Sequence, residues 1–396
     1  MSGRLQGLRG RVDVRGRVRR RRILQHQPGL SRRQVEPILV ADKAATAHDV
    51  EIAERLLAAH HAAADSAPTA PTTAREDVWT AITAGQASFA SLLERGEAEA
   101  LATYLCNVSR HDASVGITQG HHEYARLVAD RSYREFVALM AKDKLVSLGE
   151  ALGAAPVENP EQGTFGKSLS CDPAELVERI GARLGVDVTP PDVDGGLLKI
   201  DTGRGLFGER DANAIYTADL VRRTVSDVRA PRVCEIGGGS GRVAYWSRRF
   251  GLTSYTLVDL PHVNAVQGYY ALKSLPAGDV SLFGERPPGA AGARLEILPH
   301  HAIAAFGEPV FDLVLNQDSF PEMSATVVTE YLRWIRECCR GSLMSINHES
   351  KAAYGGGLEH ISVPEMIAAT GGFELSYRFP YWLRRGYVAE LYRVGR

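Results

Sequence analysis

A glycine-rich stretch, PRVCEIGGGSGRVAYW at residues 231–246, has the composition of a ligand-binding turn. Its glycines are Gly237, Gly238, Gly239 and Gly241. They follow an apolar run that ends at Ile236 and precede a helix-like run that begins near Arg242. Glycine lets a ligand approach the backbone with no Cβ in the way, and the next helix would offer free N–H groups at its start. The stretch therefore predicts a site for a nucleotide-like ligand.

Two carboxylates near this turn indicate which ligand it holds. Asp259 ends the next apolar run, 18 residues after Gly241, where a carboxylate can accept hydrogen bonds from both ribose hydroxyls. Glu235 lies two residues before the first glycine, where it would repel a pyrophosphate and attract a cationic amino group. The glycines also fit the G-x-G-x-x-A pattern of dinucleotide folds, but Glu235 favours S-adenosylmethionine over NAD. A glycine turn without a ligand is the remaining alternative.

If this ligand donates its methyl group to a hydroxyl, a positioned group is needed to take the hydroxyl proton. Two polar clusters follow later apolar runs, at residues 316–322 and 347–349. Asp318 is the first candidate for the base, with helix capping as its alternative role. His348 titrates near neutrality and is the second candidate. Glu322 is the third catalytic candidate, suited to binding substrate hydroxyls or to a hydrogen bond with His348.

Metal-assisted deprotonation is an alternative to the general base. Asp318 and Glu349, joined by Glu322 and His348, are residue types that could hold Mg²⁺. A bound Mg²⁺ would lower the pKa of an acceptor hydroxyl. The four residues form no compact ligand motif, so the sequence predicts no metal site and leaves Mg²⁺ as an alternative.

Three further residues are predicted to contact the cofactor. Leu260 follows Asp259 in the string VDLP, and Asn316 ends the string FDLVLN. Tyr216 lies before the first predicted strand, where an aromatic face would stabilise a sulfonium by cation–π attraction. Packing in the core is an equally good interpretation of Tyr216.

The segments that must position these residues alternate between strand and helix patterns from about residue 196 onward. The strand-like strings are RVCEI, SYTLVD, RLEIL, FDLVLN and GSLMSIN. Such alternation is typical of a parallel sheet with helices on both faces. We predict a doubly wound, Rossmann-like α/β fold, closed by an antiparallel hairpin of FELSYRF and YVAELYRV. Residues 46–190 show helical spacing instead.

Four strings carry a resemblance to a known family: VCEIGGGSGRVAYW, YTLVDLPHVNAVQGYYAL, FDLVLNQDSFPEM and SINHES. They resemble class I S-adenosylmethionine-dependent methyltransferases, over about residues 200–396. More narrowly, VDLP and NQDSFPEM are similar to strings of bacterial sugar O-methyltransferases. The resemblance implies that Glu235 and the glycines surround the methionine part of the cofactor and that Asp259 holds the ribose.

The same resemblance implies a reaction and leaves one contact open. The expected activity is methyl transfer to a hydroxyl of a sugar, which is a small-molecule or oligosaccharide acceptor. The alternative is a non-sugar natural-product hydroxyl, which predicts an apolar, aromatic-lined pocket in place of one lined by Asp, Asn, Gln and Trp. Many family members carry an acid after the third strand that contacts adenine. Here that strand is followed by Pro299, His300 and His301, so adenine recognition stays open.

The length and composition of the chain predict more than one folded unit. The chain has 396 residues, 44% hydrophobic and 23% charged, which is too long for one compact core. We predict a basic, disordered tail over 1–40, a helical domain over 41–195 and a methyltransferase domain over 196–396. The helical domain is expected to cover the site and shape the acceptor pocket, and a homodimer interface is an alternative role for it.

Charge, cysteines and hydropathy narrow the classes of partner. Residues 1–22 hold nine arginines and one acid, but no aromatic residue interleaves with them, so we expect no nucleic-acid partner. The five cysteines have no metal-ligand spacing, which favours reduced thiols in a cytoplasm. No apolar run approaches the ~18 residues of a membrane span. A nucleic-acid modifier and a catalytically silent scaffold are the remaining rival classes.

Overall fold

The protein is described by a computed structural model. It covers residues 35–68, 78–118, 120–159, 161, 171–193, 196–290, 292, 295–351, 353–355 and 358–395. Residues 1–34 lie outside the described residues, and they include the arginine-rich segment of the predicted disordered tail.

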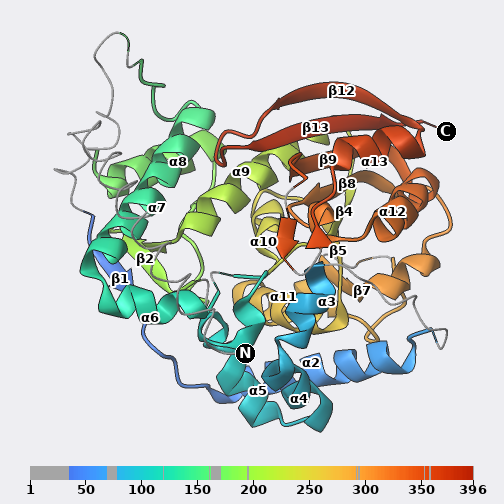
Figure 1. Ribbon diagram of the computed structural model, residues 1–396, viewed down its shortest axis with the longest axis horizontal. Coiled ribbons are helices and arrows are strands. Elements are labelled where there is room, and N and C mark those ends of the chain that lie inside the picture. The colour runs from blue at the N-terminus through green and yellow to red at the C-terminus, as the bar shows by residue number, and fades with distance from the viewer. Residues whose placement is uncertain are drawn as a thin grey trace.

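An eight-stranded sheet forms the C-terminal part of the chain (Figure 1). Its strands are β4 (Arg232–Ile236), β5 (Ser254–Asp259), β6 (Val280–Leu282), β7 (Leu295–Pro299), β8 (Phe311–Gln317), β9 (Cys339–His348), β12 (Phe373–Pro380) and β13 (Tyr387–Val394). Their order in the sheet is β12-β13-β9-β8-β4-β5-β7-β6. Neighbours are parallel except β9 with β13 and β13 with β12. The predicted parallel sheet with an antiparallel C-terminal hairpin is confirmed; β6, only three residues long, was not predicted.

Helices cover both faces of this sheet. α9 (Glu209–Thr224), α10 (Arg242–Arg249) and α11 (Pro261–Ser274) pack on one face; α12 (Ala325–Cys338) and α13 (Val363–Thr370) pack on the other. Successive side chains of a strand point to opposite faces, so Val233 enters the first core and Cys234 the second. The fold is therefore the doubly wound, Rossmann-like α/β arrangement that the sequence predicts.

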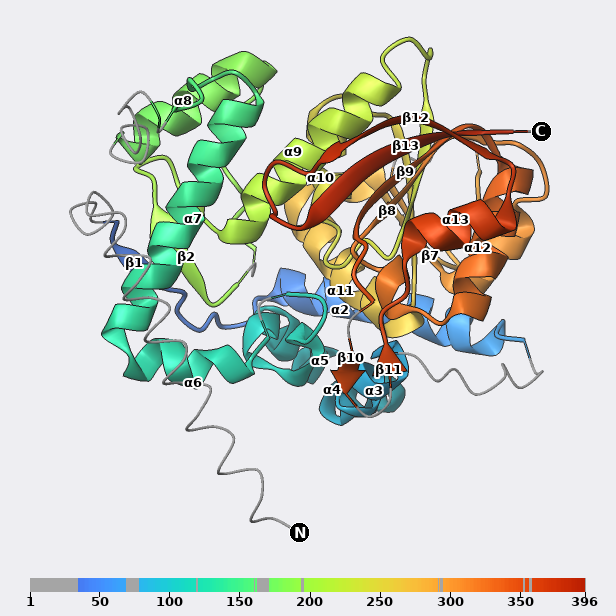
Figure 2. The same cartoon turned by 45° about the horizontal axis from the view of Figure 1, so that its top comes forward.

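The remaining helices precede the sheet in the chain and pack beside and below it (Figure 2). They are α2 (Ala47–Asp65), α3 (Val78–Ala84), α4 (Ala87–Arg95), α5 (Ala98–Leu105), α6 (His122–Ala129), α7 (Arg131–Ala151) and α8 (Pro173–Leu184). α2 lies against α11, and α7 lies against α9. Asp49 of α2 joins the two parts directly, because it accepts a hydrogen bond of 2.7 Å from the Tyr269 hydroxyl and pairs with Lys273 at 2.8 Å.

Two small sheets complete the fold, and one corrects a predicted boundary. β1 (Pro37–Leu39) pairs with β2 (Leu198–Asp201), which also pairs with β3 (Leu206–Phe207). Residues 37–39 thus form a strand where the sequence analysis placed a disordered tail, because their short apolar run finds a partner about 160 residues away in the chain. β10 (Ala353–Gly355) and β11 (Leu358–Glu359) form the second small sheet.

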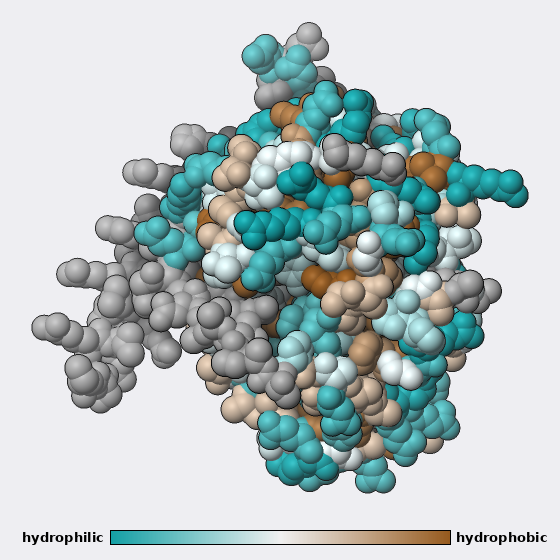
Figure 3. All heavy atoms as spheres, turned by 90° about the vertical axis from the view of Figure 1, so that its right-hand side faces the viewer, coloured by the Kyte–Doolittle hydropathy of each residue, from teal (hydrophilic) through white to brown (hydrophobic). Residues whose placement is uncertain are grey.

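One face of the molecule is mostly polar. Figure 3 shows one face on which hydrophilic residues predominate and hydrophobic ones are scattered. Among the described residues, the large hydrophobic side chains that are exposed are Val128, Met140, Val157, Val228, Leu375 and Trp382. No helix within the described ranges has both the length and the apolarity needed to cross a bilayer.

Close packing between β8 and β9 yields a first prediction. A Cβ added at Gly341 of β9 would lie 2.0 Å from the backbone carbonyl oxygen of Asp312, and neither strand can move aside without breaking the sheet. We expect Gly341→Ala to lower the free energy of unfolding by about 1–3 kcal/mol. Gly307→Ala, at a position with no atom within 4 Å of the added Cβ, is the control. Urea unfolding of both variants checks this, and equal stabilities would contradict it.

Candidate active site

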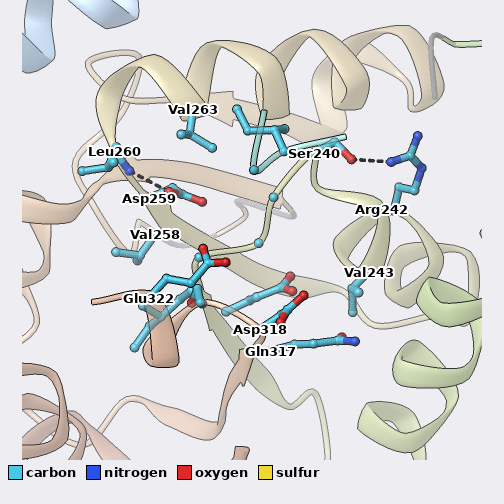
Figure 4. Close-up of a pocket in the computed structure, with 18 of the residues that line it drawn as sticks. Ser240, Arg242, Val243, Val258, Asp259, Leu260, Val263, Gln317, Asp318 and Glu322 are labelled. Carbon is cyan, nitrogen blue, oxygen red and sulfur yellow. Dashed lines mark hydrogen bonds between the residues drawn. The ribbon is translucent and has the colours of Figure 1, made fainter. Parts of the chain in front are cut away.

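A cavity of about 320 Å³ opens at the carboxyl ends of β4, β5 and β8 (Figure 4). This is the edge where the strand order reverses, and it is the usual ligand site of a doubly wound sheet. The sheet contributes the glycine turn after β4, Asp259 and Leu260 after β5, and Gln317, Asp318 and Glu322 after β8. Elements outside the sheet contribute Trp79, Gly116, Ile117, Glu209, Arg210, Asn213 and Arg384. The cavity is therefore built by both parts of the chain.

The turn after β4 adopts a conformation that requires glycine. Gly237, Gly239 and Gly241 have φ angles of 73°, 56° and 81°, in the left-handed region that other residues avoid. A Cβ at Gly237 would also lie 2.1 Å from Oγ of Ser319. Gly238 has no positive φ, but its Cβ would lie 2.6 Å from Cδ2 of Leu257. All four glycines line the cavity or begin the helix that follows it.

Glu235 reaches the cavity from inside β4. It is 2% exposed, and its Oε2 accepts a hydrogen bond of 2.8 Å from the hydroxyl of Tyr255. Burial raises the pKa of Glu235 to about 7, the hydrogen bond from Tyr255 opposes the shift, and the charge of Asp259 adds to it. A cation bound beside Glu235 would offset the cost of ionising it.

Asp259 and Leu260 line the same cavity from the end of β5. The Asp259 carboxylate accepts a hydrogen bond of 2.9 Å from the Leu260 amide at Oδ1 and one of 2.7 Å from Nε2 of Gln267 at Oδ2. Burial raises its pKa to about 7 despite these bonds. Each oxygen has a second lone pair, so the carboxylate can still accept hydrogen bonds from a diol.

Two arginines that the sequence analysis did not select lie near the turn. Arg210 donates to the carbonyl oxygens of Ile117 (3.3 Å) and Thr118 (2.6 Å), which leaves further N–H groups for a ligand. Burial, followed by the charge of Arg242, lowers the pKa of Arg210 to about 10, so it stays cationic at neutral pH. Arg242 is 5% exposed, and its Nη2 has no hydrogen-bond partner among the described residues. Only Arg242 had a signal in the sequence, its place directly after the last glycine.

Asp318 lies in the cavity with an unusual backbone conformation. Its φ is 65°, and its carboxylate pairs with Arg384 and accepts a hydrogen bond from the Tyr387 hydroxyl. Asp318 does not cap the next helix, since Ser324 accepts the capping bond from Val327 of α12. Both carboxylate oxygens are therefore engaged by groups of the β12–β13 hairpin.

Glu322 points into the cavity beside Asp318 (Figure 4). Burial and then the charge of Asp318 raise its pKa to about 7; a hydrogen bond from Trp79 and the charges of Arg384 and Arg210 oppose the shift. A carboxyl that titrates near neutrality is well matched to proton transfer at that pH.

His348 and Glu349 lie away from the cavity lining. The His348 ring faces those of His360 at 4.8 Å and Tyr387 at 5.7 Å, measured between centroids. Glu349 pairs with Arg378 at 2.6 Å on a half-exposed surface. The structure thus does not bring Asp318 and Glu349 together, because each is paired with a different arginine. Among the described residues, no group of three or more His, Cys, Asp or Glu is placed to hold a metal ion.

Asn316 and Tyr216 are buried and lie outside the cavity lining. Asn316 is 0% exposed, and its amide bonds to the Ile236 carbonyl oxygen (3.1 Å), to Ser319 Oγ (2.6 Å) and to Asn347 (3.0 Å between Nδ2 and Oδ1). The Tyr216 ring packs against that of Tyr381, with 5.3 Å between centroids. Both were predicted to contact the cofactor, and the structure places both behind the residues that line the site.

His300, which follows β7, lines the cavity together with Val327 and Tyr331 of α12. The histidine alternative left open for adenine recognition thus corresponds to a residue at the cavity, while His301 accepts or donates a hydrogen bond of 3.0 Å with Ser66.

The solved structures that are similar to this protein match a little under half of its chain. No family model and no curated protein matches it. Among solved structures it is similar to the [4+2]-cyclase SpnF (16% identity, 47% of this chain and 82% of that chain, TM-score 0.35). It is also similar to magnesium protoporphyrin IX methyltransferase from Synechocystis PCC 6803 (14% identity, 47% of this chain and 84% of that chain, TM-score 0.33). A third similar structure is that of 1,6-didemethyltoxoflavin-N1-methyltransferase from Burkholderia thailandensis (18% identity, 46% of this chain and 79% of that chain, TM-score 0.30).

The raised pKa values predict how stability depends on pH. A carboxyl whose pKa is higher in the folded state stabilises that state below its ordinary pKa, and the contribution is lost as the pH rises through the folded value. Glu235 has an ordinary value of 4.5 and a folded value of about 7. We therefore expect the ligand-free protein to lose about 2 kcal/mol of unfolding free energy through Glu235 between about pH 5 and about pH 8.

Denaturant unfolding across this pH range measures the effect. In Glu235→Gln the dependence on pH is expected to be shallower, because one titrating group is gone. Glu374→Gln, on the exposed part of β12, should keep the original dependence. An unchanged dependence in Glu235→Gln would contradict the prediction.

Proposed function

We propose that the protein is an S-adenosylmethionine-dependent O-methyltransferase. The observation that carries the proposal is that one cavity joins donors and acceptors suited to an amino acid and a ribose to a polar end that holds Glu322 and Asp318. When bound, the cofactor supplies a methyl group on a positively charged sulfur. The fold is consistent with this activity but does not define it.

The groups around the glycine turn fit the amino-acid end of this cofactor. Glu235 suits the ammonium group, and Arg210 and Arg242 suit the carboxylate, since both arginines have N–H groups left over. Asp259 suits the ribose hydroxyls because its carboxylate lines the cavity and its oxygens have lone pairs for further hydrogen bonds. The glycines keep side chains out of the space between these groups.

The acceptor end supports a sugar as the substrate class. Its polar side chains are Glu209, Asn213, Gln317, Asp318, Glu322 and Arg384. The only aromatic residues among the described lining are Trp79 and Tyr331. A non-sugar natural product would favour an aromatic, apolar wall, so this lining supports the hydroxyls of a carbohydrate, as the sequence resemblance implied.

Glu322 is the better candidate for the general base. Asp318 is paired with Arg384 and bonded to Tyr387, so both of its carboxylate oxygens are already engaged by protein groups. Glu322 has a pKa of about 7 and can remove the hydroxyl proton as the methyl group is transferred. Asp318 would then act through Glu322, because its negative charge raises the pKa of that carboxyl.

Calorimetry tests the cofactor. We expect S-adenosylhomocysteine to bind and NAD not to bind, and Asp259→Ala to weaken binding of the former. Because an ammonium group favours ionised Glu235, affinity should rise about tenfold from about pH 6 to about pH 8, and less in Glu235→Gln. Heat on adding NAD, with none on adding S-adenosylhomocysteine, would overturn the proposal.

Turnover tests the base, using the best acceptor from a panel of mono- and oligosaccharides. We expect Glu322→Gln to lower kcat by about 10²–10⁴-fold with unchanged affinity for S-adenosylhomocysteine. Asp318→Asn should keep more activity and move the acidic limb of kcat/KM to lower pH, because a negative charge beside Glu322 is lost. An active Glu322→Gln beside an inactive Asp318→Asn would assign the base to Asp318 instead.

A further inference from the structure

The turn that joins β12 to β13 places Arg384 at the wall of the cavity. The Tyr381 amide donates to the carbonyl oxygen of Tyr387 at 2.8 Å, and the Tyr387 amide donates to that of Arg384 at 3.1 Å. Tyr381 is 2% exposed; its hydroxyl donates to the carbonyl oxygen of Asn213 at 3.0 Å and lies 2.9 Å from Oγ1 of Thr217. The turn is therefore fixed against α9, and so is the backbone that carries Arg384.

The guanidinium group of Arg384 is oriented by two contacts. Its Nη1 donates to Oδ2 of Asp318, and its central carbon lies 3.9 Å from the centroid of the Tyr387 ring. Within the described part of the chain, the bond to Asp318 is the only hydrogen bond that this side chain makes. A guanidinium has five N–H donors in one plane, and this one is 43% exposed. Most of its donors therefore remain available to a molecule in the cavity.

Asp318, the anchor of this guanidinium, is itself held in place. Its other carboxylate oxygen accepts from the Tyr387 hydroxyl, and its backbone N–H donates to Oδ1 of Asn347 at 2.8 Å. Glu322 lies beside Asp318 in the same wall of the cavity (Figure 4). An acceptor hydroxyl that faces Glu322 would therefore bring neighbouring oxygens of the same molecule toward Arg384.

We propose that Arg384 is a specificity-determining residue: its remaining N–H groups bind a second oxygen of the sugar acceptor and so fix which hydroxyl faces Glu322. This rests on the proposed function. The second oxygen belongs to a hydroxyl or to a carboxylate on the sugar, since a guanidinium donates to both. A site built to hydrogen-bond an oxygen discriminates against an analogue that lacks it, because the donor is left unpaired.

Deoxy analogues of the best acceptor test this contact, each lacking one hydroxyl other than the methylated one. For a hydroxyl, we expect the protein to lose about 10–100-fold in kcat/KM with one analogue, and Arg384→Met to lose little more with that analogue than with the parent sugar. For a carboxylate, we expect the uronic acid of the same sugar to be preferred over the neutral sugar, and Arg384→Met to lose that preference. Affinity for S-adenosylhomocysteine should stay unchanged.

Two further variants separate this contact from a role in holding Asp318 alone. Arg384→Lys keeps a cation beside Asp318 but has no planar fork that can reach two partners. It should regain turnover relative to Arg384→Met without regaining the discrimination. Arg340→Met is the matched control, because Arg340 also pairs with an aspartate, Asp312 at 2.7 Å, but lies outside the cavity lining. It should discriminate as the unaltered protein does.

Two results would contradict the inference, and they differ in what else they affect. If Arg384→Met and Arg384→Lys are active and keep the original order of preference among all analogues and the uronic acid, the role of Arg384 is overturned and the proposed function stands. If the unaltered protein binds S-adenosylhomocysteine but methylates no sugar of the panel, the proposed sugar methylation is overturned and this inference with it.

Discussion

A single buried amide, that of Asn316, fixes the relative positions of the two ends of the cavity. Its Nδ2 donates to the carbonyl oxygen of Ile236, directly before the glycine turn, and to Ser319, directly after Asp318. Its Oδ1 accepts from Asn347 near the end of β9, and Asn347 in turn accepts from the backbone N–H of Asp318. Because an unsatisfied buried group costs about 1–3 kcal/mol, these elements cannot separate cheaply. The cofactor end and the acceptor end are therefore held as one unit.

This rigid frame carries carboxyls in an environment that disfavours their charge. The pKa values of Glu235, Asp259 and Glu322 are all about 7, and burial is the largest cause in each. A protein selected for stability alone would replace such groups by apolar ones. Their retention around one cavity indicates a binding or catalytic use, since a cationic ligand near Glu235 and a hydroxyl near Glu322 both interact with the ionised form.

The sheet and the glycine turn could be predicted from the sequence because their signals are local. Each buried strand is a short apolar run, and a strained turn needs glycine at fixed positions. The partners of Asp318 could not be predicted in this way, because Arg384 lies 66 residues further along the chain. A left-handed φ at Asp318 has no sequence signal, since aspartate occupies many conformations. Pattern alone therefore identified Asp318 as a residue of the site, but it could not show that both carboxylate oxygens are engaged by the hairpin.

The same reasoning explains why the acceptor is harder to infer than the cofactor. The proposed cofactor end is made mainly by the ends of two neighbouring strands, β4 and β5, whereas the acceptor end combines Trp79 of α3, Asn213 of α9 and Arg384 of the hairpin. At the cofactor end, only Arg210 is held by the carbonyl oxygens of a distant segment, those of Ile117 and Thr118, among the contacts of the described residues. In the proposed function, the choice of acceptor thus depends on contacts between distant segments. The Rossmann-like sheet therefore constrains the proposed cofactor more tightly than the molecule that would be methylated.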